Sequence, residues 1–353
     1  MFTIQDILRV ATEKKSSDIH LAVDSPPAFR IHGELIPVGN TVLTREDTKQ
    51  LAYSMMTIEL KQRFEEKGES DFSYALPGVG RFRVNAFRQK GCVGLVIRMI
   101  PFNVPSFESL RLPSVIMDLA KLHKGMVLVT GPTGSGKSTT LASMIDYINS
   151  DRRAHIITLE DPIEYLHRHK KSLVNQRELG TDTQSFAAAL RAVLRQDPDV
   201  ILVGELRDME TIATALTAAE TGHLVFSTLH TNDATQTVDR IIDVFPSEQQ
   251  QQIRVLLSAV LQGVVAQQLL PKADGTGRVA AIELLVATPA IRNLIREGKT
   301  HQIYNSIQTG ARYGMQTMDK ALLELYSSGL ITYDEAERKM VDPEALKKTS
   351  FGF

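Results

Sequence analysis

The chain has 353 residues, a length that suits roughly two or three domains. Its 40 Lys and Arg residues are balanced by 41 Asp and Glu residues, so it lacks the global basic field that non-specific binding to nucleic acid or acidic lipid needs. A single cysteine, Cys92, excludes an intrachain disulfide and a cysteine zinc cluster. No apolar run approaches the ~18 residues of a membrane span, so we expect a cytoplasmic protein that meets membranes only through partners.

The first hundred residues alternate between helical and strand patterns. A pattern resembling a capping box, Thr44 followed by Asp47, opens one of the helices. We expect helices over 3–15, 44–56 and 58–67 and strands over 17–23, 27–32, 69–76, 80–89 and 92–99, with a turn at Gly33-Glu34. The pattern predicts a mixed α+β domain over residues 1–100.

Two arginines in this domain share one face of an expected strand. Alternation puts Arg81 and Arg83 on one face and Phe82 and Val84 on the other. Strand arginines usually face water, so a solvated surface is one interpretation. A basic strand in a domain without its own nucleotide site could instead reach the phosphates bound by another subunit.

A stretch with little periodicity follows this domain. Residues 100–113 contain three prolines, Pro101, Pro105 and Pro113. Proline disrupts regular structure, so we expect an interdomain linker over 101–113.

The second part of the chain begins with an expected helix over 114–123 and then alternates strands with helices. Strands are expected over 154–160, 199–205 and 223–230, and helices over 183–195 and 209–221. This alternation predicts a mostly parallel α/β sheet within a domain spanning 114–288, with its ligand at the carboxyl ends of the strands. We further expect a long helix over 248–268 and a strand or hairpin over 277–287. A helical region over 289–353 would hold helices at 290–298, 300–308, 317–329 and 332–339, before a loosely ordered tail at 347–353.

The strongest motif lies at Met126–Thr140, where an apolar strand leads into Gly131-x4-Gly136-Lys137-Ser138 and then a helix. This is a P-loop in its expected context. Its glycines allow a backbone that approaches phosphate closely, Lys137 supplies a positive charge, and Ser138 can bind Mg²⁺. The expected ATP-binding residues are Gly131, Pro132, Thr133, Gly134, Ser135, Gly136, Lys137, Ser138 and Thr139.

Acids and a histidine follow other expected strands. Glu160 and Glu164 lie in Leu159–Glu164, and Glu205 ends the strand over 199–205, where a Walker-B aspartate is common. A lone carboxylate usually caps a helix or faces water, but two such strand ends beside a complete P-loop favour catalytic or metal-binding roles. His230 ends a further strand; it is either structural or a hydrogen-bond partner of the γ-phosphate.

These segments together resemble the secretion-ATPase superfamily, which drives type II secretion and type IV pili. Residues 194–208 resemble its Walker-B signature, 157–164 its Asp box and 222–230 its His box. Residues 290–298 resemble a motif of the pilus retraction ATPases. The extension and secretion branches commonly carry a longer N-terminal region and a four-cysteine zinc motif, which a chain with one cysteine cannot build.

The resemblance implies a homohexameric ring of subunits, each with an N-terminal PAS-like domain and a RecA-like P-loop ATPase domain. ATP would lie between the domains, and a neighbour's Arg81 and Arg83 would complete the site. An Asp-box acid would act as general base: Glu164 first, then Glu160, which we expect to end the strand next to the P-loop strand. Ser138 and Glu205 would position Mg²⁺.

The implied function is Mg-ATP hydrolysis that drives pilus retraction and twitching motility. Domain motion would act on an inner-membrane platform protein, and the protein would sit at the cytoplasmic face of that membrane. A nucleic-acid translocase is a rival hypothesis, although the net charge of −1 argues against direct nucleic-acid binding. A non-hydrolysing nucleotide switch and an auxiliary paralogue of the motor are two further hypotheses. Residues 290–298 are either an ordinary packed helix or a surface needed for retraction.

Overall fold

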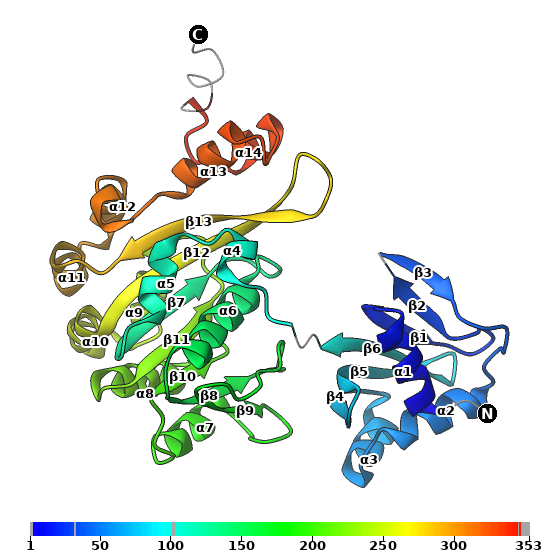
Figure 1. Ribbon diagram of the computed structural model, residues 1–353. Helices are drawn as coiled ribbons and strands as arrows, with labels where there is room; N and C mark the ends of the chain where they lie inside the picture. The colour runs from blue at the N-terminus through cyan, green and yellow to red at the C-terminus, as the bar shows by residue number, and fades with distance from the viewer. Residues whose placement is uncertain (1–2, 32, 101–102, 345, 347–353) are drawn as a thin grey trace. The chain divides into compact units, whose positions relative to one another are not determined.

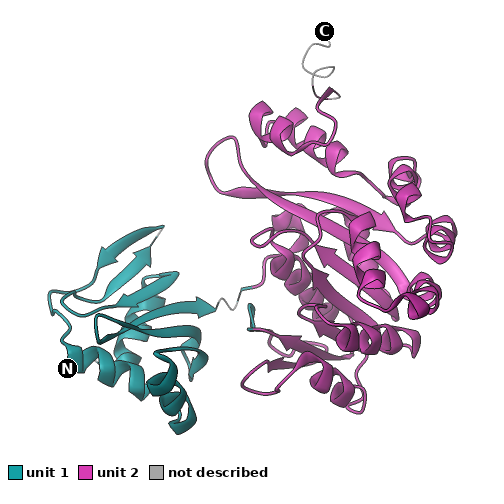
Figure 2. Ribbon diagram, turned by 180° about the vertical axis from the view of Figure 1, so that it is seen from behind, with its two compact units in different colours: residues 1–103, 162–166 teal, residues 104–161, 167–353 magenta. Residues whose placement is uncertain are grey.

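The computed structural model describes residues 3–31, 33–100, 103–344 and 346. The chain divides into two compact units, which Figure 2 distinguishes by colour. Unit 1 comprises residues 1–103 with the short segment 162–166, and unit 2 comprises residues 104–161 and 167–353. The end of the expected strand at His32, the first two linker positions and the expected loose tail at 347–353 lie outside the described residues.

Unit 1 is built on a six-stranded antiparallel sheet with the order β3-β2-β1-β6-β5-β4 (Figure 1). Its core joins aromatic side chains of the strands, such as Phe29 and Phe82, to Phe64 of a helix. The elements are α1 (Ile4–Glu13), β1 (Asp18–Leu21), β2 (Ala28–Ile31), β3 (Glu34–Pro37), α2 (Arg45–Ser54), α3 (Ile58–Lys67), β4 (Glu69–Leu76), β5 (Gly80–Gln89) and β6 (Cys92–Ile100).

Two local predictions for unit 1 are confirmed. Thr44 and Asp47 form a reciprocal capping box at the start of α2: Asp47 N donates to Thr44 Oγ1, and Thr44 N donates to the Asp47 carboxylate. On β5, Phe82 is fully buried while Arg83 is exposed and Arg81 is half-buried. The arginines therefore lie on the outer face of this strand, as its alternation predicts.

Unit 2 is organised around a seven-stranded sheet with the order β13-β12-β7-β11-β10-β8-β9. Every neighbouring pair is parallel except β12 with β13, which confirms the predicted mostly parallel sheet. The strands are β7 (Gly125–Thr130), β8 (His155–Glu160), β9 (Leu173–Glu178), β10 (Val200–Val203), β11 (Leu224–Leu229), β12 (Leu261–Pro271) and β13 (Arg278–Val286).

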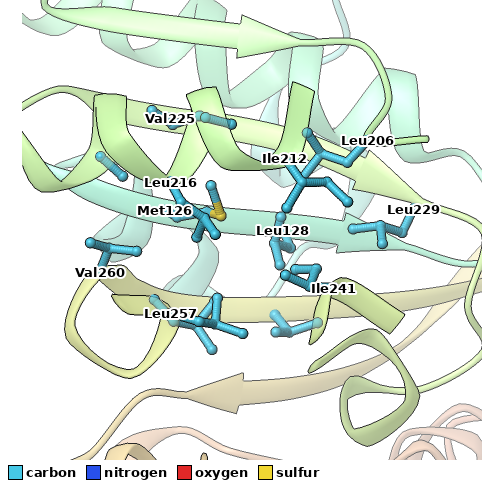
Figure 3. Close-up of a cluster of buried hydrophobic side chains, with 14 of the residues drawn as sticks. Met126, Leu128, Leu206, Ile212, Leu216, Val225, Leu229, Ile241, Leu257 and Val260 are labelled. Carbon is cyan, nitrogen blue, oxygen red and sulfur yellow. The ribbon is translucent and has the colours of Figure 1, made fainter. Parts of the chain in front are cut away.

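Helices cover both faces of this sheet, so its central strands are buried on each side. Met126 and Leu128 of β7 face the core that α7–α10 cover, and Figure 3 shows them near Leu216 and Leu257. Val127 and Val129 face the opposite core, which α4–α6 cover. These helices are α4 (Phe107–Leu110), α5 (Ser114–Ala120), α6 (Lys137–Asp151), α7 (Phe186–Val193), α8 (Met209–Glu220), α9 (Ala234–Asp243) and α10 (Ser247–Val260).

The prediction of one long helix over 248–268 is wrong for residues 261–268. The helix α10 ends at Val260, and the chain continues at once as strand β12. The reason is burial on both faces: Val264 packs in one core and Val265 in the other, which a strand between β7 and β13 achieves. Gly263 allows the close packing, because a Cβ there would lie 2.8 Å from Leu119 Cδ1.

Elements that were not predicted include α4, β3, β9 and α9. The first lies within the expected linker. Phe107 of α4 is buried in the core of unit 2 and packs edge-to-face on Tyr147 of α6, with ring centroids 5.8 Å apart. Residues 104–113 are accordingly part of unit 2 rather than a free connection.

The helical C-terminal region is confirmed over its described residues. It contains α11 (Pro289–Arg296), α12 (Ile303–Gln308), α13 (Met318–Ser327) and α14 (Tyr333–Lys339), with 3-10 turns before α12 and before α13. In α11, Ile291 and Ile295 are fully buried, and Arg292 donates to the carbonyls of Ser258 and Ala259 near the end of α10. The side of α11 that carries Ile291 and Ile295 is therefore an ordinary packed helix face. No helix of the described residues is long and apolar enough to cross a membrane.

A buried carboxylate, Glu283 of β13, joins two of these helices to the sheet. Its Oε1 accepts from Ala234 N at the start of α9 (2.8 Å), and its Oε2 accepts from Met318 N at the start of α13 (3.4 Å). Burial raises the pKa of Glu283, and the carboxylates of Asp233 and Asp319 add to this, against the lowering effect of the two N–H bonds.

We expect this raised pKa to make the stability of the protein depend on pH. A carboxyl whose folded pKa is raised contributes stability that is lost as pH rises through that pKa. As pH rises above the ordinary pKa of a glutamate, the unfolding temperature of Glu283→Gln should therefore rise relative to wild type. Thermal unfolding at several pH values measures this difference.

Glu297→Gln is a control of opposite sign, because hydrogen bonds from Lys299 and Asn293 lower the pKa of Glu297. Removing that carboxylate should produce a small relative loss of stability at higher pH. A difference between Glu283→Gln and wild type that stays flat with pH would contradict the prediction.

Candidate nucleotide-binding site

The P-loop follows β7, a strand that is buried at every residue and lies between β11 and β12. The loop spans Gly131–Gly136, and α6 begins at Lys137. Gly131, Gly134 and Gly136 have φ of 142°, 79° and 91°, values that L-residues with a Cβ rarely adopt. The strand, loop and helix that the motif predicts are therefore present.

The loop presents polar groups suited to an anion. The N-cap of α6 is Gly136, which has no side chain to bond the first N–H groups of the helix, so these groups and the helix dipole suit phosphate oxygens. The Ser135 hydroxyl is buried and has no hydrogen-bond partner in the described part of the chain. Pro132, Thr133, Gly134 and Ser138 are exposed and Thr139 is half-buried.

Lys137 is the buried cation of this loop. Its side chain turns back over the loop and donates to Gly131 O (2.7 Å) and Pro132 O (3.1 Å). Burial lowers the pKa of the Lys137 ammonium, and the carboxylate of Glu205 opposes this. A phosphate group offers stronger, charged acceptors than these two carbonyls, so a bound phosphate would replace them as the partners of the ammonium.

Glu205 follows β10 at the same edge of the sheet and is held by two basic groups. Arg207 Nη2 lies 2.8 Å from Glu205 Oε2, and His230 Nε2 lies 3.4 Å from Glu205 Oε1. Partial burial would raise the pKa of Glu205, but the Arg207 hydrogen bond and the charges of His230 and Arg207 outweigh burial and lower it. The structure therefore keeps an ionised carboxylate near the P-loop lysine, together with the predicted His230.

Glu160 ends β8, but β8 is not the strand next to the P-loop strand. Both β11 and β10 lie between β8 and β7, so that expectation is wrong. The reason is the crossover order of the sheet, which places strands that follow each other in the chain apart in space. Glu160 Oε1 accepts from Thr158 Oγ1 (2.6 Å) and Gln176 Nε2 (3.1 Å).

The remaining predicted residues belong to unit 1. Glu164 lies in the segment 162–166 that groups with unit 1, and Arg81 and Arg83 lie on β5. The P-loop, Glu160, Glu205 and His230 all lie in unit 2. The predicted roles of Glu164 and of the two arginines remain predictions.

Two further contacts fix the loop and were missed by sequence reasoning. On the β11 side, Thr130 Oγ1 donates to Thr231 O (2.6 Å), and Thr231 Oγ1 is 2.7 Å from Thr237 Oγ1 of α9. On the β12 side, Gln267 bonds the loop directly. The adjacent Gln267-Gln268 pair in an apolar run was the available signal for Gln267, but the expected helix concealed it.

The P-loop and the neighbouring Glu205 offer donor groups of the types that bind Mg²⁺ beside a nucleotide. No group of three or more His, Cys, Asp or Glu side chains that could hold a metal occurs among the described residues. Mg²⁺ in phosphate sites usually takes one or two protein ligands, phosphate oxygens and waters. The Ser138 hydroxyl and the ionised Glu205 are the donor types that such a site uses.

A P-loop at the carboxyl ends of parallel strands, with a buried lysine and an ionised glutamate, defines a P-loop nucleotide-binding protein. Comparison with known proteins gives the family. Residues 2–338 match the family of type II/IV secretion system proteins, and the chain belongs to this family.

The chain is similar along nearly its whole length to proteins described as acting in pilus retraction or twitching motility. It is 50% identical over 341 residues to the type IV pilus retraction ATPase PilT of Pseudomonas aeruginosa, covering 97% of this chain and 99% of that one. It is 50% identical over 345 residues to the twitching motility protein of Neisseria gonorrhoeae, covering 98% of this chain and 92% of that one. The crystal structure of the pilus retraction motor PilT with bound ADP matches with a TM-score of 0.91 and 54% identity, covering 99% of this chain and all of that one.

Proposed function

We propose that this protein is the ATPase motor of type IV pilus retraction, which converts ATP and water to ADP and phosphate. The observation that carries the proposal is the P-loop with buried Lys137 beside ionised Glu205, in a chain 50% identical to PilT over 97% of its length. A retraction motor supports twitching motility, and the relative from Neisseria gonorrhoeae carries that description.

The geometry of unit 2 supports the following roles in phosphoryl transfer. The N–H groups at the start of α6 bind the phosphates, and Lys137 leaves the carbonyls of Gly131 and Pro132 to neutralise the β- and γ-phosphate oxygens. Ser138 and the ionised Glu205 would hold Mg²⁺, which would supply positive charge to the phosphate oxygens when it is bound. His230, 3.4 Å from Glu205, donates a hydrogen bond toward the γ-phosphate.

The general base is Glu164, with Glu160 as the second candidate. One oxygen of Glu160 already accepts two hydrogen bonds, from Thr158 and Gln176. Those bonds hold the Glu160 carboxylate in place at the end of β8, and two strands separate β8 from the P-loop strand. Glu164 is exposed, so its carboxylate is accessible to an attacking water.

The proposed assembly is a homohexameric ring in which ATP lies between a RecA-like domain and PAS-like domains. The exposed Arg83 and the half-buried Arg81 supply positive charge to the ATP of a neighbouring subunit. Hydrolysis changes the angle between the two domains, and the motion acts on a platform protein of the inner membrane. The motor works at the cytoplasmic face of that membrane through this partner and without direct nucleic-acid contact.

Lys137→Ala should abolish phosphate release by the purified protein, because it removes the charge that binds the β- and γ-phosphates. In cells that lack the gene, wild type should restore pilus retraction, whereas Lys137→Ala should leave pili that extend and do not retract. Lys124→Ala, an exposed lysine just before β7, removes the same charge and should preserve both. Undiminished turnover in Lys137→Ala protein would contradict the enzyme assignment.

Arg83→Ala should reduce turnover by at least about tenfold while ATP binding changes little, since the arginine acts on transition-state charge. Arg63→Ala, an exposed arginine on α3, is the matched control and should match wild type. Steady-state phosphate release and ATP titration separate the two effects. Hydrolysis that is unchanged in Arg83→Ala would show that this residue does not act on a neighbour's ATP.

A further inference from the structure

Gln267 lies on β12 directly beside the start of the P-loop. The parallel pairing of β12 with β7 reaches Ala266 opposite Thr130, so Gln267 is the first β12 residue beyond the end of β7. It is only 3% exposed, whereas its neighbour Gln268 is half-buried. A buried amide at this position needs hydrogen-bond partners, and the P-loop supplies them.

Both ends of the Gln267 amide are used. Nε2 donates to Ser135 O (2.8 Å) in the loop, and Oε1 accepts from Thr140 Oγ1 (2.8 Å) in the first turn of α6. A carbonyl oxygen only accepts, so the amide nitrogen must face Ser135 and the orientation of the side chain is determined. Gln267 thus ties the loop to the helix that follows it.

Two of the three P-loop glycines make room for this residue. A Cβ at Gly131 would lie 2.2 Å from Gln267 O, and a Cβ at Gly136 would lie 2.7 Å from Gln267 Nε2. A Cβ at Gly134 would meet no atom within 4 Å. Gly131 and Gly136 therefore serve the contact with β12 as well as the backbone conformation of the loop.

The bond to Ser135 O also orients the next amide. In a planar trans peptide, the C=O and N–H groups point to opposite sides. Because Ser135 O points toward Gln267, the N–H of Gly136 points away from Gln267. We propose that Gln267 is a positioning residue that presents the Gly136 N–H to the phosphates of the bound nucleotide.

The proposal rests on the nucleotide-binding function proposed above and makes a distinct claim about affinity. If Gln267 only stabilised the fold, its loss would lower the unfolding temperature of the nucleotide-free protein and leave the affinity for ADP unchanged. If it positions the Gly136 N–H, its loss weakens ADP binding, because a loop that is no longer held must be ordered by the ligand. An uncharged amide suits this role because it does not compete with phosphate for Lys137.

The test is titration of wild type, Gln267→Met and Gln268→Met with Mg-ADP, together with thermal unfolding of each nucleotide-free protein. Gln267→Met keeps the length of the side chain and removes both hydrogen bonds. It should weaken ADP binding by roughly 5- to 100-fold, the range expected when a buried polar group loses its partner. Gln268→Met, the matched change one residue along β12, should bind ADP like wild type.

Two more variants decide the question if Gln267→Met does not fold. Gln267→Glu keeps an oxygen that accepts from Thr140, but it replaces the amide nitrogen that donates to Ser135 O with a second oxygen, which repels that carbonyl. This variant should also weaken ADP binding. Thr140→Val removes one anchor of the amide and should give a smaller loss. ADP affinity equal to wild type in the folded variants, with or without a lower unfolding temperature, would overturn the role of Gln267. Failure of wild type itself to bind ADP would instead overturn the proposed function.

Discussion

The structure of unit 2 depends on the burial of one strand, β7, between β11 and β12. Both neighbours hydrogen-bond β7 up to Thr130, and its side chains fill the cores on both faces of the sheet. Where β7 ends, its neighbours hold the loop that follows: Thr130 bonds Thr231 on one side, and Gln267 bonds Ser135 on the other. These hydrogen bonds hold the conformation of the loop, so its N–H groups are pre-organised for phosphate.

The same hydrogen bonds continue toward the C-terminal helices. Thr231 bonds Thr237 of α9, Glu283 accepts from the first N–H group of α9, and the other oxygen of Glu283 accepts from the first N–H group of α13. These contacts link the segment after β11 to the first turns of α9 and α13 through the buried Glu283.

Local patterns predicted the P-loop, the capping box at Thr44, most strands and the C-terminal helices, because each depends on residues near one another in the chain. Two features depend on the order of strands in the sheet, which no local pattern encodes. The first is β12, a strand buried on both faces. Its nearly continuous run of apolar residues lacks the alternation of a half-buried strand, so it was predicted as helix and the contact of Gln267 with the loop was missed. The second is the distance of Glu160 from the P-loop strand, since crossovers place β11 and β10 between them.

The most direct test of this account is a crystal structure of the protein with Mg-ADP. The account predicts that the β-phosphate lies at the N-terminus of α6, that Lys137 Nζ leaves the carbonyls of Gly131 and Pro132 to bind it, and that the bond from Gln267 to Ser135 O persists. The account would be contradicted by a nucleotide bound elsewhere, or by a loop that breaks its contact with β12 when ADP binds.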